Sequence, residues 1–177
     1  MLFRSHRPTP STQAPPAAVA WALAATPRQQ VIIHLASSDR RAEEIGRALA
    51  AFAPSRPIRV LPAWDCLPYD RASPSRDIMG RRARLVAGLA AGVTDGLIVV
   101  VSPEAVVQRL PPAAVVANAV LTLRPGDRLD REALARFAAR TGYVTDERID
   151  EPGEIALLGE VVDIFPPDAA KPDRKST

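Results

Sequence analysis

Cysteine is nearly absent from this chain: Cys66 is the single one among 177 residues. One thiol cannot form an internal disulfide or a multi-cysteine zinc site, and such sparing use of cysteine fits a reducing compartment. The two histidines, His6 and His34, are far apart in sequence, and neither has a cysteine beside it. We therefore expect no metal ion and no cofactor, and we interpret His34 as a core residue and Cys66 as a small buried thiol.

Long apolar runs are also missing. No stretch approaches the roughly 18 residues that a membrane-spanning helix needs. The first eleven residues carry Arg4 and Arg7 but no continuous apolar segment before a small-residue cleavage site, so we expect no secretory signal. These absences predict a cytoplasmic protein that does not enter a membrane.

Lysine is scarce. Lys171 and Lys175 are the two lysines among 23 basic residues, and the others are arginine. The chain also has 31 alanines and 18 prolines, which indicates a compositional bias rather than a selected basic surface. A net charge of +3 is modest, and nucleic-acid binding would need the basic residues to gather on one face. Net charge therefore excludes no partner class by itself.

Strands and helices alternate over residues 15–112. Short apolar runs at 31–35, 58–61 and 97–101 are typical of strands, and the first and last of them predict strands buried on both faces. Helices are expected at 17–25, after Ser38 or Asp39, at 75–91, and after Ser102, where Pro111-Pro112 would stop the last one. This order predicts an α/β fold with a parallel sheet, preceded by a mobile tail over 1–14.

Residues 113–177 have a different pattern. We expect a strand at 119–123, a turn at Pro125-Gly126-Asp127, and a helix over 131–140 that begins after Asp130 and ends at Gly142. Antiparallel strands are expected at 143–149 and within 155–165, on either side of the turn 151–154. The second segment is therefore predicted to be a small α+β domain.

A phosphate-binding loop is absent where an α/β nucleotide enzyme would have one. The turn after the first strand, residues 36–41, contains neither glycine nor lysine, and Asp39 would repel a phosphate. Asp65 and Asp70 flank Tyr69 in the loop 62–74, but loop aspartates usually cap backbone N–H groups or pair with arginines rather than act as acid and base. We predict that the chain is not an enzyme.

Arginines recur near two aromatic residues, which leaves DNA contact open as an alternative. The candidate contacts are Arg71, Arg76, Arg81 and Arg84, close in sequence to Trp64 and Tyr69. Against this stands a solvated helix face on which Asp77 pairs with Arg81, with the aromatic side chains anchoring the loop.

Specific strings in the sequence resemble the N-terminal module of the bacterial transcription–repair coupling factor family. Residues 61–71 read Leu-Pro-Ala-Trp-Asp-Cys-Leu-Pro-Tyr-Asp-Arg. Further similar strings lie at 106–112, 126–130, 142–143, 151–154 and 162–167, in the order in which the family has them.

This resemblance implies a fold and a partner. It implies a RecA-like domain 1a that has lost its nucleotide-binding motif, over residues 15–112, followed by domain 2, over 113–177, which in the family docks the damage-recognition protein UvrA. The implied function is a non-enzymatic protein-interaction module of transcription-coupled nucleotide excision repair. The residues assigned to the partner surface are Tyr143, Arg148, Glu154, Leu158 and Gly159.

Three departures from the family pattern qualify this expectation. Two arginines of the family fall on Val144 and Leu158, which cannot make charge-assisted contacts, and Glu160 adds a charge of the opposite sign. The family continues into further strands after Pro166-Pro167, so we expect a truncated domain 2 with an open sheet edge here. UvrA binding is expected to be weakened, and a degenerate fragment without present function is the remaining alternative.

Overall fold

The computed structural model describes residues 14–67, 69, 71–124, 127–159, 161–167, 169 and 171–176. The expected tail over 1–14 (apart from Ala14), the Pro125-Gly126 part of the expected turn, Asp70 and Glu160 lie outside them. Packing contacts divide the chain into two compact units. Unit 1 comprises residues up to 63 together with 93–109, and unit 2 comprises 64–92 together with 110 onward.

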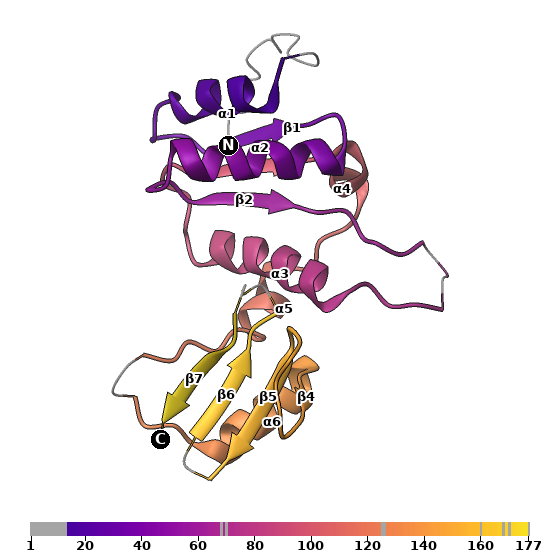
Figure 1. Cartoon of the computed structure of the whole chain (residues 1–177), viewed down its shortest axis with the longest axis vertical. Helices are drawn as coiled ribbons and strands as arrows, with labels where there is room; N and C mark the ends of the chain where they lie inside the picture. The colour runs from indigo at the N-terminus through magenta and orange to yellow at the C-terminus, as the bar shows by residue number, and fades with distance from the viewer. Residues whose placement is uncertain are drawn as a thin grey trace. The chain divides into compact units, whose positions relative to one another are not determined.

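Unit 1 contains a three-stranded parallel sheet, which confirms the expected α/β pattern (Figure 1). Its strands are β1 (Ile32–Leu35), β2 (Ile58–Leu61) and β3 (Ile98–Val101), in the order β1-β3-β2. The registers place Ile32 of β1 and Ile58 of β2 on either side of Ile98. β3 is therefore the central strand.

Two helices cover one face of this sheet. They are α1 (Pro16–Ala24) and α2 (Asp39–Phe52). Ser38 is the N-cap of α2, since its Oγ accepts a hydrogen bond from the Arg41 N–H at 3.3 Å. The core beneath them combines Val19 and Ala20 of α1, Ala42, Ile45 and Leu49 of α2, and Ile98 and Val100 of β3.

The apolar runs at 31–35 and 97–101, which contain β1 and β3, differ in burial, although both were expected to be buried on two faces. All four residues of β3 are buried, as expected. In β1, however, Ile33 and Leu35 are 64% and 59% exposed, so this part of the expectation was wrong. The cause is strand order: β3 has a neighbour on each side, whereas β1 lies at the edge of the sheet.

Close packing between α2 and β2 depends on Gly46. A Cβ atom added there would lie 2.3 Å from Cγ2 of Val60. Gly46→Ala is therefore expected to lower the free energy of unfolding by about 1–3 kcal/mol through overpacking, even though alanine favours helix by about 1 kcal/mol. Chemical denaturation followed by circular dichroism measures this change.

The double variant Gly46→Ala/Val60→Ala is the control for that prediction. Removing the Val60 methyl groups makes room for the new Cβ, so the double variant should be more stable than the sum of the two single changes predicts. Simple additivity would contradict the steric explanation.

The first helix of unit 2 is α3 (Arg76–Ala90). It starts after the N-cap Ser75, close to the expected 75–91. The short helix α4 (Pro103–Val107) belongs to unit 1 and ends before Leu110, earlier than Pro111-Pro112 would require. Helix α5 (Ala113–Ala117) follows in unit 2 and contacts α3. Residues 119–123, expected as a strand, form no strand; Ala119 and Val120 continue a turn from α5 through backbone hydrogen bonds.

The second sheet has four strands in the order β4-β5-β6-β7, with α6 (Arg131–Thr141) packed on one face (Figure 1). Asp130 caps α6 by accepting a hydrogen bond from the Ala133 N–H at 3.0 Å, and Gly142, with φ 83°, ends it as expected. β5 (Glu154–Leu158) and β6 (Val161–Phe165) form the expected antiparallel hairpin.

Two features of this sheet differ from the expectation. The segment 143–149 yields the two-residue β4 (Val144–Thr145), and it pairs with β5 in the parallel direction. Residues 173–176, expected as the tail of a truncated domain, form β7 (Asp173–Ser176), which pairs with β6. β7 is therefore the last strand of the sheet on this side, and the open edge of a truncated domain stays a prediction. Whether the two predicted domains, divided at 112, fold independently stays a prediction.

Candidate functional site

The face of the second sheet that points away from α6 carries the main candidate surface; we call it the outer face. Ile155 and Val162 pack against α6, so the residues that alternate with them face the other way. Register pairs Ala156 with Asp163 and Leu158 with Val161 on this outer face. Along this face Leu158 is exposed and Val161 is half-buried, whereas Ala156 and Asp163 are buried, at 1% and 9% exposure.

Val144 and Leu158 lie on the same outer face. Val144 is in register with Glu154, which alternates with Ile155 and so shares the face of Ala156 and Leu158. Val144 is 40% exposed and Leu158 is 48% exposed. Leu158 lies four positions along β5 from Glu154, the register partner of Val144, and β4 and β5 are one strand spacing apart. Val144 and Leu158 are therefore about 14 Å apart. The two positions at which the resemblance predicts arginine are therefore both exposed and lie on the same face of the sheet.

A hollow of about 440 Å³ adjoins Leu158. Arg148 and Leu158 line it together, so the structure brings these two expected partner residues into one place. The remaining lining residues are Glu147, Ile149, Asp163, Pro172 and Asp173. Sequence reasoning missed Asp163 as a site residue, although an aspartate inside the apolar strand 161–165 is the signal that could have found it.

Arg148 lies among acidic residues. Its Nε is 3.4 Å from a carboxylate oxygen of Asp150, and both side chains are well exposed. Asp146 accepts hydrogen bonds from the N–H groups of Glu147 and Arg148. Because this pair is exposed, it contributes about 0–1 kcal/mol to stability, and Arg148 remains accessible to a partner.

The other three expected partner residues have structural surroundings. Tyr143 packs against the core beneath α6, on the side opposite Leu158. Glu154 accepts hydrogen bonds from the N–H groups of Asp150 and Glu151 at 2.8 and 2.9 Å and so holds the loop before β5. Gly159, with φ 52°, begins the turn between β5 and β6, and its carbonyl accepts a hydrogen bond from Arg131.

The four arginines proposed for DNA contact have different environments. Arg81 is 3.8 Å from Asp77 on α3, the pairing expected for a solvated helix face. Arg76 and Arg84 line a hollow beside α3, whereas Arg71 is exposed in the preceding loop. DNA contact therefore stays a prediction.

The loop before α3 is anchored at its base. Arg82 is buried, and its guanidinium carbon lies 4.2 Å from the centre of the Trp64 ring, a cation–π contact. Asp65 accepts hydrogen bonds from the Ser75 N–H at 3.0 and 3.3 Å, and this bonding lowers the pKa of Asp65. Trp64 and Asp65 thus have the anchoring and capping roles that sequence reasoning expected. Tyr69 was expected to anchor the loop together with Trp64, and this part was wrong, because its side chain is fully exposed. Cys66 is half-buried.

The turn after β1, where an α/β nucleotide enzyme would bind phosphate, is occupied by the α2 cap. An oxygen of Asp39 accepts a hydrogen bond from the Ala63 N–H at 3.1 Å, which joins the start of α2 to the segment that follows β2. His34 is half-buried; burial, together with the charge of Arg41, lowers its pKa. Among the described residues, no three His, Cys, Asp or Glu side chains are grouped as a metal site.

Within the described part of the chain, no helix combines the length and the apolar character needed to cross a bilayer.

Comparison with known proteins identifies the second unit more closely. Residues 121–175 match the family model of the UvrB interaction domain. This range contains α6, the strands β4, β5 and β6 and most of β7, and hence the whole outer face.

Curated relatives extend the similarity into the first unit. The chain is 29% identical to the transcription-repair-coupling factor of Haemophilus influenzae over 82% of its own length and 12% of the relative. For the same factor of Escherichia coli the identity is 33% over 63% of this chain and 10% of the relative. The chain is 28% identical to the factor of Mycobacterium bovis over 91% of its own length and 13% of the relative.

The chain thus spans about an eighth of the length of the relatives it matches. It is similar to the transcription-repair-coupling factors over most of its own length, and residues 121–175 of its second unit match the UvrB interaction domain.

Proposed function

We propose that this chain is a protein-interaction module of transcription-coupled nucleotide excision repair, which docks a UvrA-type damage-recognition protein through the outer face of its second sheet. The observation that carries the proposal is the match of residues 121–175 to an interaction domain, within which Val144 and Leu158 share one exposed face. These are the two positions at which the family has arginine.

Several features support a role without catalysis. The turn after β1 has no glycine or lysine to cradle a phosphate, and Asp39 places a carboxylate there that is bonded to the Ala63 N–H. Residues 15–112 are then a RecA-like domain that binds no nucleotide. Binding by surface recognition is the activity that remains.

The composition of the outer face implies an affinity lower than that of family members with both arginines. An arginine makes charge-assisted and often bidentate contacts with a carboxylate, whereas valine and leucine offer apolar contact alone. The exposed acidic residues near Leu158, which include Glu147 and Asp173, further disfavour an acidic partner. Weak docking follows from this charge distribution.

Titration of the chain with the UvrA protein of the same organism tests the proposal. Leu158→Arg is expected to raise the affinity about tenfold, because it restores one charge-assisted contact at an exposed position. Isothermal titration calorimetry measures the dissociation constant of each variant. Adding Val144→Arg should raise the affinity further.

Val107→Arg is the matched control. Val107 is 82% exposed in α4 of the first unit, so this change adds the same charge away from the outer face and should leave the affinity within about twofold. A tight complex that ignores Leu158→Arg would show that the docking surface lies elsewhere. Absence of binding even by the double arginine variant would contradict docking itself.

A further inference from the structure

Strand β1 leaves one edge of the first sheet without a neighbour. The order β1-β3-β2 places β1 at the end of the sheet, and among the described residues no strand lies on its other side. The Ile32 N–H donates to the carbonyl of Leu97, directly before β3, at 2.9 Å. Backbone groups of successive strand residues point in alternate directions, so the N–H and C=O groups of Ile33 and Leu35 point away from β3. These groups are available to an added strand.

The side chains along this edge are apolar. Ile32 packs into the core beneath α1 and α2, so Ile33 and Leu35 face the other side of the sheet, where they are 64% and 59% exposed. Proteins protect sheet edges with charged side chains or proline, which prevent pairing with another chain. Residues 31–35 contain no aspartate, glutamate, lysine, arginine or proline. The β1 edge therefore lacks this protection.

The opposite edge of the same sheet is protected. There the Ile98 N–H donates to the Pro57 carbonyl at 3.0 Å, so the next carbonyl along β2, that of Ile58, points away from β3. Nη1 of Arg59 donates to this Ile58 carbonyl at 2.8 Å. A charged side chain bonded to an edge carbonyl hinders the addition of a further strand. The first sheet thus has one open edge and one blocked edge.

We propose that two copies of this chain pair through β1 in the antiparallel direction and so join their first sheets into one. An open edge binds an extended strand, and β1 of a second copy is such a strand with an equally open edge of its own. The β2 edges, where Arg59 bonds to the Ile58 carbonyl, then end the joined sheet on both sides. Association therefore stops at two copies, as an isologous two-fold contact does.

A two-fold axis at His34 gives the register that uses the outward groups of both residues. It places Ile33 of one copy opposite Leu35 of the other, and in an antiparallel sheet such a pair exchanges both of its N–H···O bonds. The same pair occurs twice by symmetry, and its apolar side chains meet on the exposed side of the sheet. The two His34 side chains lie opposite each other without repulsion at neutral pH, because burial lowers the pKa of His34.

This pairing does not depend on the outer face. β1 belongs to the first unit, whereas the outer face belongs to the second. Self-association and UvrA docking are therefore tested, and can fail, separately.

Sedimentation equilibrium across a concentration series from micromolar to millimolar tests the proposal. The unaltered chain is expected to pass from one copy to two, with no larger species. Ile33→Lys/Leu35→Lys should weaken association about tenfold or more, because the register places the new lysines opposite each other. Both side chains are well exposed, so the fold should tolerate the changes. Circular dichroism shows that each variant is folded.

Ala51→Lys/Phe52→Lys is the matched control. Both residues are exposed at the end of α2, which covers the face of the sheet opposite to Ile33 and Leu35. The control adds the same charge away from the β1 edge, and it should leave the dissociation constant within about twofold of that of the unaltered chain.

A charge-swapped pair of variants separates this contact from any other mode of association. Ile33→Glu/Leu35→Glu should also weaken self-association, because like charges again lie opposite each other. An equimolar mixture of the lysine and glutamate variants places opposite charges at these positions. The mixture should form mixed pairs that neither variant forms alone.

Four results would overturn the proposal. A monomeric unaltered chain throughout the series would assign the β1 edge to a strand of another protein. The others are a lysine variant that associates as strongly as the unaltered chain, a charge-swapped mixture that stays monomeric, and assemblies of more than two copies.

Discussion

Arg56→Ala is expected to lower the free energy of unfolding of the first unit by about 3 kcal/mol. Arg56 is only 6% exposed, and its Nε donates to the Gly96 carbonyl at 2.9 Å. Its Nη1 donates to the carbonyls of Ala24 and Thr26 at 3.3 and 2.9 Å, at the end of α1. Alanine would leave several buried carbonyls without a donor.

The charge of Arg56 adds to this effect. Carbonyl groups at the C-terminal end of a helix carry a partial negative charge, which a cation stabilises. Arg56→Lys keeps the charge, but the single side-chain nitrogen of lysine cannot reach both Gly96 and the end of α1. We therefore expect a free energy of unfolding between that of the unaltered chain and that of Arg56→Ala.

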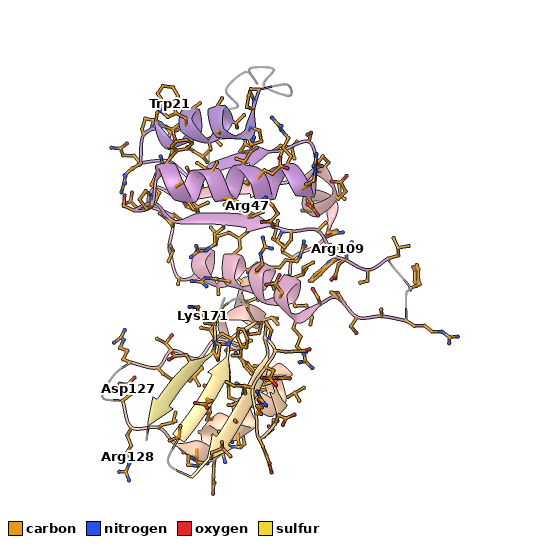
Figure 2. The ribbon with its side chains drawn as sticks, in the orientation of Figure 1. Trp21, Arg47, Arg109, Asp127, Arg128 and Lys171 are labelled. Atoms are coloured by element: carbon orange, nitrogen blue, oxygen red, sulfur yellow. The ribbon has the colours of Figure 1, made fainter. Side chains whose placement is uncertain are left out.

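Fluorescence of Trp21 during urea denaturation, in a Trp64→Phe background, reports on the first unit alone. Trp21 lies on α1 and is 66% exposed (Figure 2). Arg47→Ala is the control, because Arg47 lies on the exposed side of α2 (Figure 2) and its loss should cost less than about 0.5 kcal/mol. Equal effects of the Arg56 and Arg47 changes would contradict the role of the buried hydrogen bonds.

Arg82→Ala is expected to destabilise the second unit by about 3 kcal/mol. Arg82 is 1% exposed and is the largest fully buried side chain of the described residues. Removing the Arg82 side chain leaves a cavity beside α3 and ends the contact with the Trp64 ring.

A double-mutant cycle with Arg82→Ala and Trp64→Leu isolates the cation–π contact. We expect a coupling energy of about 1–2 kcal/mol, since the guanidinium is shielded from water. Urea denaturation followed by circular dichroism gives the four stabilities. The control is Arg81→Ala, which removes a partly exposed arginine paired with Asp77 and should cost less than about 1 kcal/mol. A coupling energy near zero would show that Trp64 and Arg82 contribute independently.

Local signals in the sequence predicted most helices correctly. Ser38, Ser75 and Asp130 begin α2, α3 and α6 as N-caps, and Gly142 ends α6. These predictions succeed because a cap depends on residues within one turn of the helix. The strand expected at 119–123 was wrong, because its apolar residues line a hollow beside α3 instead of pairing with a neighbouring strand.

Burial of charged residues could not be predicted from the same signals. Arg56 and Arg82 look like other arginines in a chain rich in them, yet each is enclosed. The carbonyls that bind Arg56 come from residues 23–26 and 96, which are distant in sequence. Enclosure of an arginine depends on such long-range contacts, and alternation of residue types along a strand or helix does not encode them.

By itself, the sequence determined the parallel α/β pattern of the first unit, the helix boundaries set by caps, the absence of a phosphate loop and the resemblance to the coupling factors. These properties rest on neighbouring residues. Tertiary structure alone decided that β3 is central and β1 lies at an edge, that Val144 and Leu158 share one face, and that Arg56 and Arg82 are buried. The reason is that strand order and packing join residues far apart in the chain, and their outcome depends on all the pairings at once.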